Sequence, residues 1–102
     1  MPEISLEARA HVFSALADPT RLKLVELLAA EDQLCGTQMA QRAGISIALL
    51  SHHWKILSEA GVVVRERRGQ RQFCRVDRDV LEAAFAYVWP SNRIQSALPP
   101  RG

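Results

Sequence analysis

The chain has 102 residues, of which 48% are apolar, and its formal net charge is +2 at pH 7. That length supports one globular domain with a single hydrophobic core. No apolar run approaches the roughly 18 residues that a membrane span requires. The first ten residues also lack a charged segment followed by an apolar one, which is the pattern of a secretory signal. We therefore expect a soluble, cytoplasmic protein with no membrane partner.

The sequence does not favour an enzyme. It contains no Gly-rich loop that would hold a phosphate, and no nucleophile, base and orienting group fall into a catalytic pattern. So small a core also leaves little space for a substrate cavity. Two cysteines, Cys35 and Cys74, are too few for a disulfide framework, and a cytosolic compartment would keep them reduced.

The first third of the chain predicts two helices. Apolar residues recur at helical spacing from Leu6 to Ala17, which indicates the first helix. Asp18 can cap the next helix, with Pro19 at its first position, where the missing amide costs nothing. That second helix, at about residues 19–30, is apolar around much of its circumference. We expect it to be the central core helix.

The middle of the chain predicts a helix-turn-helix. A short helix at 37–43 ends at Gly44, and a second helix at 46–59 begins with Ser46 as its N-cap and closes at Gly61. In this motif the second helix lies in a DNA major groove.

The second of these helices has two different faces. Helical periodicity places Leu49, Leu50, His53, Trp54, Ile56 and Leu57 on the buried face. The residues that we expect to contact DNA from the outward face are Ser46, Ile47, Ala48, Ser51, His52 and Lys55. Hydroxyl, imidazole and ammonium groups are donors suited to base edges or phosphates, and the two apolar residues would touch a thymine methyl or reduce base specificity.

A β-hairpin follows the helix-turn-helix. The run Val62–Val64 and the alternating segment Gln72–Val76 predict two strands, joined by a tip at 68–70 with Gly69 at positive φ. Six of the thirteen basic residues of the chain are arginines at 65–78, which makes a local positive stripe.

Such a hairpin beside a helix-turn-helix forms a wing, which lies along the DNA backbone and minor groove, where guanidinium groups meet phosphate. The wing residues expected to contact DNA are Arg65, Arg67, Arg68 and Arg71. Because side chains alternate between the two faces of a strand, these four cannot all reach the same groove.

The last predicted helix, at about 78–89, is capped by Asp77 and ended by Pro90. The folded domain would then span residues 1–89, and residues 90–102 would form a loose C-terminal tail. So small a domain cannot bury both terminal helices, and the exposed apolar patch would be covered by a second copy in a symmetric homodimer. The residues expected at this interface are Phe13, Leu16, Phe85, Val88 and Trp89.

Three segments resemble the ArsR/SmtB family of winged-helix transcriptional repressors. They are Ala15-Leu-Ala-Asp-Pro-Thr-Arg-Leu22, Leu50-Ser-His-His-Trp-Lys-Ile-Leu57 and Ala60-Gly-Val-Val63. The resemblance covers about Leu6 to Trp89. It implies a mainly α winged helix-turn-helix (α+β) with a two-stranded wing, and a homodimer that binds operator DNA. It also implies release when a metal, metalloid, oxidant or sulfur species engages cysteine or histidine.

The resemblance does not extend to the two common metal sites of the family. Its arsenic or cadmium site has Leu-Cys-x-Cys at the start of the third helix, where this chain has Leu34-Cys35-Gly36-Thr37. One thiolate cannot form the three-sulfur shell that a soft metalloid prefers. Its zinc site has Asp-x-His and a later histidine, where this chain has Asp77-Arg78-Asp79 and no later histidine. We predict no metal or other cofactor, with ligation by Cys35 as the weaker alternative.

The two cysteines offer a candidate thiol or redox sensor. In winged-helix folds the segment before the third helix pairs with the second wing strand, which would place Leu34-Cys35 beside Phe73-Cys74-Arg75. With Cα atoms within about 7 Å, Cys35 and Cys74 could form a reversible disulfide. Arg75 could lower a thiol pKa. The alternative is that both are small buried hydrophobic residues.

The predicted function is a homodimeric repressor that binds operator DNA through the helix at 46–59 and the wing at 62–76, and that a signal releases. The alternative is a dimeric protein-interaction or thiol-sensing module that keeps the fold without binding DNA. That alternative draws on the apolar Ile47 and Ala48 and on the modest net charge. We expect His53 to be a satisfied, partly buried histidine and Trp54 to lie in the core.

Overall fold

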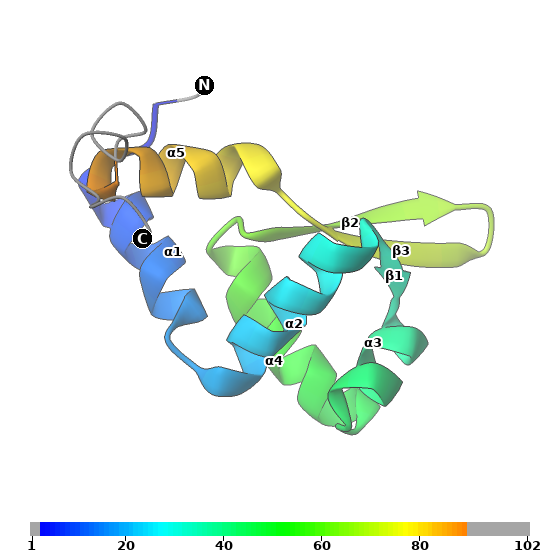
Figure 1. Ribbon diagram of the computed structural model, residues 1–102. Helices are drawn as coiled ribbons and strands as arrows, with labels where there is room; N and C mark the ends of the chain where they lie inside the picture. The colour runs from blue at the N-terminus through cyan, green and yellow to red at the C-terminus, as the bar shows by residue number, and fades with distance from the viewer. Residues whose placement is uncertain (1–2, 90–102) are drawn as a thin grey trace, which may run out of the picture.

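The computed structural model describes residues 3–89 (Figure 1). Within that range the order of elements is α1 (Leu6–Leu16), α2 (Pro19–Glu31), β1 (Leu34–Cys35), α3 (Gly36–Ala43), α4 (Ile47–Glu59), β2 (Val63–Arg68), β3 (Arg71–Val76) and α5 (Arg78–Val88). The predicted helices and wing strands are therefore confirmed, with small shifts at their ends. The predicted C-terminal tail lies outside the described residues.

The three strands form one antiparallel sheet in the order β1-β3-β2. In β1, Leu34 pairs with Cys74 and Cys35 with Phe73, which confirms the predicted pairing of this segment with the second wing strand. A two-residue turn joins β2 to β3, and its Gly69 has a φ of 63°. The hairpin projects from one end of the molecule, and α1 and α5 meet at the other (Figure 1).

The core lies between α2, α3, α4 and the base of the wing. Its least accessible large side chains are Leu24, Leu28, Met39, Leu57, Val12, Val62 and Val63. Helix α2 contributes Leu24, Val25 and Leu28 to this core, as predicted for the central helix. Its Leu22, on the far side, reaches solvent.

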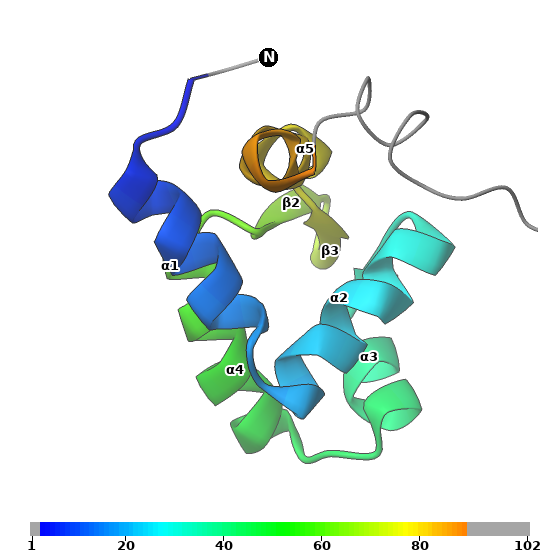
Figure 2. The same ribbon diagram turned by 60° about the vertical axis from the view of Figure 1, so that its left-hand side comes forward.

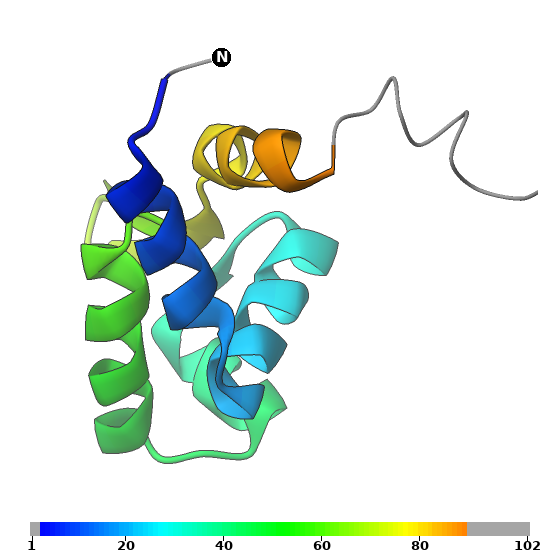
Figure 3. The same cartoon turned by 90° about the vertical axis from the view of Figure 1, so that its left-hand side faces the viewer.

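Helix α1 lies beside α4, and α5 crosses above them (Figures 2 and 3). The residues that α1 buries are Val12 and Ala15, whereas Leu6 is 68% exposed. Helix α5 buries only the small residues Ala83 and Ala84. Both terminal helices therefore pack through small contact areas and leave their larger apolar side chains outside.

Side-chain caps set where four of the helices begin. Ser5, Asp18, Ser46 and Asp77 each have an extended backbone and a side-chain oxygen that accepts a hydrogen bond from an amide in the first turn. The last three were predicted from the sequence. No helix within residues 3–89 has the length and apolar character that crossing a membrane requires.

The cap at Asp18 makes the stability of the fold depend on pH. The hydrogen bond from the Arg21 amide, together with the charge of the Arg21 guanidinium, holds the pKa of the Asp18 carboxyl below its ordinary value. A carboxyl with a lowered pKa stabilises the fold above its unfolded pKa of about 3.9, and that contribution is lost as the pH falls through the folded value.

We therefore expect wild type to lose more thermal stability than Asp18→Asn between pH 7 and pH 3. Asparagine is an equally good N-cap that does not titrate, so the variant shares every other acid-sensitive group. Melting temperatures of the two proteins across this range measure the difference. A gap between them that stays constant with pH would contradict the assignment.

Candidate nucleic-acid interface

Helix α4 presents the face that the sequence predicted. Its predicted DNA-contact residues Ser46, Ile47, Ala48, Ser51, His52 and Lys55 are all exposed. Its buried residues are Leu50, His53, Trp54 and Leu57. The hydroxyl, imidazole and ammonium groups on this helix are therefore free to meet a partner surface.

Leu49 was predicted to be buried, and this was wrong, since 42% of it is exposed. The N-terminal part of α4 extends past the end of α1, which covers the later turns of the same helix (Figure 3). Helical periodicity places Leu49 on the stripe that contains His53 but does not tell where the covering helix stops.

The wing carries exposed arginines on both faces. Arg65, Arg67, Arg68 and Arg71 are all exposed. Arg65 pairs with Cys74 in the ladder, whereas Arg68 lies on the opposite face, with its guanidinium 5.6 Å from the Phe73 ring centroid and 3.3 Å from Glu66 Oε2. The predicted division of the arginines between two faces is confirmed.

A groove of about 590 Å³ joins α4 to the wing. It is lined by Cys35, Gly36, Thr37, Gln38, Ile47, Leu50, Ser51, Trp54, Arg65, Arg71, Gln72 and Cys74, none of which is acidic. A second groove of about 360 Å³ is lined by Ser51, Trp54, Lys55, Ser58, Glu59 and Arg65. Arg65 lines both grooves, and its guanidinium lies 5.2 Å from the Trp54 ring centroid. The donors of α4 and the cations of the wing thus form one continuous surface.

The two cysteines are close in the fold and occupy diagonal positions of the ladder. Cys35 pairs with Phe73 and Leu34 pairs with Cys74, and both cysteines line the groove between α4 and the wing. Both cysteines are free. In a regular ladder, diagonal neighbours on adjacent strands point to opposite faces, whereas a disulfide needs Cβ vectors that point toward each other.

The electrostatics of Cys74 also differ from the prediction. Cys74 is 4% exposed, and burial raises the pKa of its thiol. The cation that opposes this shift is Arg65, its ladder partner, and not Arg75 as the sequence suggested. Cys74 is therefore the less reactive of the two thiols on both accessibility and charge.

The residues present do not fit a metal site of the kind that some members of the resembling family use. Within residues 3–89, no group of three His, Cys, Asp or Glu side chains is placed to hold a metal ion. The position that would supply a second sulfur near Cys35 is Thr37, and Cys74 is buried.

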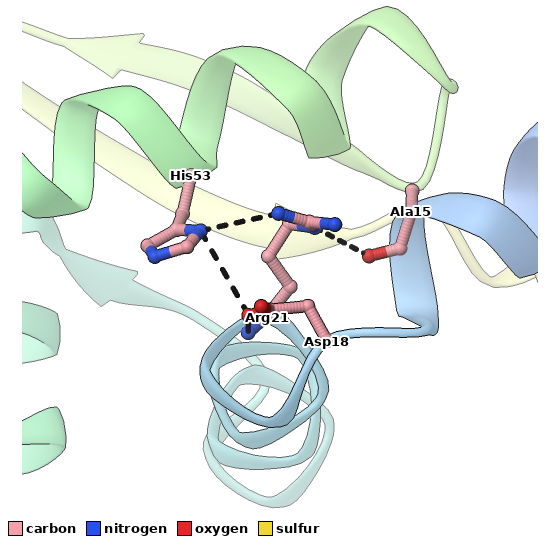
Figure 4. A network of polar contacts seen from close by, with 4 residues as sticks. All are labelled: Ala15, Asp18, Arg21 and His53. Atoms are coloured by element: carbon pink, nitrogen blue, oxygen red, sulfur yellow. Dashed lines mark hydrogen bonds and ion pairs between the residues drawn. The ribbon is translucent and has the colours of Figure 1, made fainter.

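A polar network holds the buried side of α4 (Figure 4). His53 is 8% exposed, and its Nδ1 lies 3.4 Å from Arg21 Nη1 and 4.0 Å from Asp18 Oδ2. Arg21 Nε also donates to the Ala15 carbonyl at 2.7 Å. Because a guanidinium can only donate, His53 Nδ1 is the acceptor in this contact. His53 is a satisfied histidine, as predicted.

Arg21 was not predicted from the sequence to have a role. Its only signal was its place three residues after the cap Asp18, in the segment at 15–22 that resembles the repressor family. Arg21 and His53 are 32 positions apart, so no local pattern pairs them.

The exposed apolar side chains of the terminal helices lie on α1 and α5. The predicted interface residues Phe85, Val88 and Trp89 are exposed, while Phe13 and Leu16 are partly buried against the core. The rings of Phe13 and Phe85 meet edge to face at 5.3 Å. Two further exposed residues, Leu6 and Tyr87, were not predicted.

Comparison with known proteins agrees with this architecture. Residues 16–66 match a family model described as a helix-turn-helix domain. The transcriptional repressor SdpR of Bacillus subtilis (strain 168) is 38% identical over 78 residues, covering 76% of this chain and 86% of SdpR. The chain belongs to the ArsR/SmtB family of winged helix-turn-helix transcriptional repressors.

A further relative and a solved structure support the assignment to this family. A cadmium resistance regulatory protein CadC homolog of Staphylococcus aureus is 32% identical over 82 residues, covering 76% of this chain and 68% of that protein. A homodimeric winged helix-turn-helix DNA-binding domain from Mycobacterium bovis, a possible ArsR-family regulator, has a TM-score of 0.69 at 26% identity. The structural match covers 94% of this chain and 90% of that domain.

The two thiols should differ in reactivity. We expect Ellman's reagent to modify Cys35 quickly and Cys74 slowly in the folded protein, because burial limits access to Cys74 and raises its pKa. Time courses on wild type, Cys35→Ser and Cys74→Ala assign each phase, and full denaturation should equalise the rates. Two equally fast thiols, or their joint loss as an intramolecular disulfide after mild oxidation, would contradict this arrangement.

Proposed function

We propose that the protein is a homodimeric repressor that binds operator DNA, with α4 in the major groove and the wing on the flanking backbone. The observation that carries this proposal is the continuous surface formed by α4 and the wing, in which Arg65 lies beside Ser51 and Lys55. The ArsR/SmtB family assignment supports it. A regulator of this kind works in the cytoplasm, beside the chromosome.

In this proposal the residues of α4 divide into two roles. Ser51 and His52 hydrogen-bond to base edges, and Ile47 and Ala48 touch thymine methyl groups at the start of the helix. Lys55 and the wing arginines Arg65, Arg67, Arg68 and Arg71 neutralise phosphates, which position the protein but carry no sequence information.

The proposed dimer forms through α1 and α5. Several apolar side chains of these helices are exposed to solvent, among them Val88 (62% exposed) and Trp89 (51% exposed). An exposed apolar patch of this kind is unusual on a small monomeric protein. The homodimeric Mycobacterium bovis domain with the same fold supports this assembly. A two-fold axis at this surface would present two copies of α4 about one DNA turn, roughly 34 Å, apart.

In this proposal a thiol-reactive signal releases the protein from DNA. Of the two thiol-sensing candidates, Cys35 is the more accessible, so a thiol-reactive signal would act there by addition to one sulfur. The rival function, an interaction module that does not bind DNA, would not need the exposed arginines of the wing. It predicts almost no retention on heparin or on generic duplex at low salt.

Two classes of α4 variant should behave differently on DNA. We expect Lys55→Ala to weaken binding to all duplexes and to reduce the salt dependence of log K by about one unit of slope, because it removes one phosphate contact. We expect His52→Ala to change the preference between sequences instead. Fluorescence anisotropy over a salt series, with a duplex selected by the wild-type protein and a random duplex, measures both effects.

The matched control is Lys23→Ala, which removes the same charge from an exposed position on α2, together with one hydrogen bond of 3.4 Å from Lys23 Nζ to the Ala43 carbonyl. This control should leave both affinities and the salt dependence near wild type. Equal losses of affinity for the selected and the random duplex in His52→Ala would contradict its base-reading role. A Lys23→Ala protein that binds DNA as weakly as Lys55→Ala would contradict the phosphate contact assigned to Lys55.

A further inference from the structure

Arg21 connects the helix proposed to pair the two copies with the helix proposed to read DNA. It lies in the first turn of α2, between α1 and α4 (Figure 4). Its Nε donates to the Ala15 carbonyl in the last turn of α1 at 2.7 Å. Its Nη1 donates to Nδ1 of His53, near the middle of α4, at 3.4 Å. One side chain therefore touches both helices.

The contact on the α1 side satisfies a group that would otherwise be costly. The last carbonyls of an α-helix have no intrahelical partner, and Ala15 is 3% exposed, so little water reaches it. A positive guanidinium is also favourable at a helix C-terminus, where the helix dipole is negative. Arg21 is thus held firmly to α1.

The same guanidinium group also makes the contact with α4, through His53. Nε and Nη1 belong to one planar fork with fixed geometry, so fixing one nitrogen on Ala15 restricts where the other can meet His53. Asp18 supports this arrangement from below, because it accepts the Arg21 amide hydrogen bond at 3.0 Å and lies 4.0 Å from His53 Nδ1. The orientation of α4 relative to α1 follows from a rigid connection.

We propose that Arg21 is a positioning residue that sets the tilt of α4 on α1, and through it the spacing between DNA half-sites that the dimer accepts. The proposal rests on the dimeric DNA-binding function. Helix α4 begins six residues before His53, so about 9 Å of helix lies beyond the contact at 1.5 Å per residue. A tilt of about 10° would move that end by about 1.6 Å, or about 3 Å between two-fold-related copies, close to the 3.4 Å rise of one base pair.

The test compares duplexes that carry the same two half-sites with separations changed by one or two base pairs, and a duplex with a single half-site. Wild type should prefer one separation about tenfold over its neighbours, because a misplaced second half-site loses the gain from bivalent binding. Arg21→Met keeps the length of the side chain and removes both hydrogen bonds. We expect its optimum to shift or flatten to less than about threefold, while its affinity for a single half-site stays within about twofold of wild type.

Two pairs of variants separate positioning from stability. His53→Phe keeps a ring but removes the acceptor and should reproduce the spacing profile of Arg21→Met, whereas His53→Gln keeps an acceptor and should restore the wild-type optimum. Arg21→Lys keeps the charge without the planar fork and should broaden the optimum. Melting temperatures of the same variants measure their stability independently of the spacing preference.

An unchanged spacing optimum in Arg21→Met and His53→Phe, or an equal loss at every separation and on the single half-site, would overturn the proposal. If Arg21→Met does not fold, Arg21→Lys and His53→Phe decide in the same way. Failure of wild type to bind any duplex would instead defeat the proposed function itself, so the two failures are distinguishable.

Discussion

The burial of Leu50, Trp54 and Leu57 along one side of α4 determines where every side chain on its other side lies. Each such burial is worth about 1.5–3 kcal/mol relative to exposure, which is enough to keep a 13-residue helix in one rotation. The outward face can then remain polar and uncovered without weakening the fold. The guanidinium of Arg65, on the wing, lies over the ring of Trp54, on α4. Helix α4 and the wing therefore form one surface, because both contact the buried Trp54 side chain.

The limited size of the core also explains why the terminal helices leave apolar side chains exposed. Helices α2, α3 and α4 and the base of the wing take up most of the core, so α1 and α5 bury mainly small residues such as Ala15 and Ala83. Their larger side chains are left outside, in contact with each other or with solvent. In the proposed dimer, a second copy of the chain covers these side chains. The proposed dimer interface and the proposed DNA-reading face then occupy different parts of the molecule, joined by the network around Arg21.

Local chemistry in the sequence was enough to predict most of the fold. Caps such as Asp18, Ser46 and Asp77 mark where helices begin, and Gly69 marks the wing turn, because each depends on neighbours within a few residues. The exposed face of α4 followed from helical periodicity for the same reason.

The errors came from features that local patterns do not contain. The exposure of Leu49 depends on where a different helix ends. The cation beside Cys74 is Arg65 and not Arg75, because the register of the hairpin places Arg65 opposite Cys74. The contact of Arg21 with His53 depends on tertiary packing of segments 32 positions apart. The family resemblance pointed to both segments of that network without indicating that they touch.

The most direct test of the account is the distance between the two copies of α4 in the assembled protein. Spin labels on His52→Cys, in a background with Cys35→Ser and Cys74→Ala, allow this distance to be measured by pulsed dipolar spectroscopy. The account predicts one population centred at about 34 Å, the repeat of a DNA turn, which Val88→Asp should abolish. The absence of dipolar coupling in the unaltered interface, or a distance far from that repeat, would contradict the account.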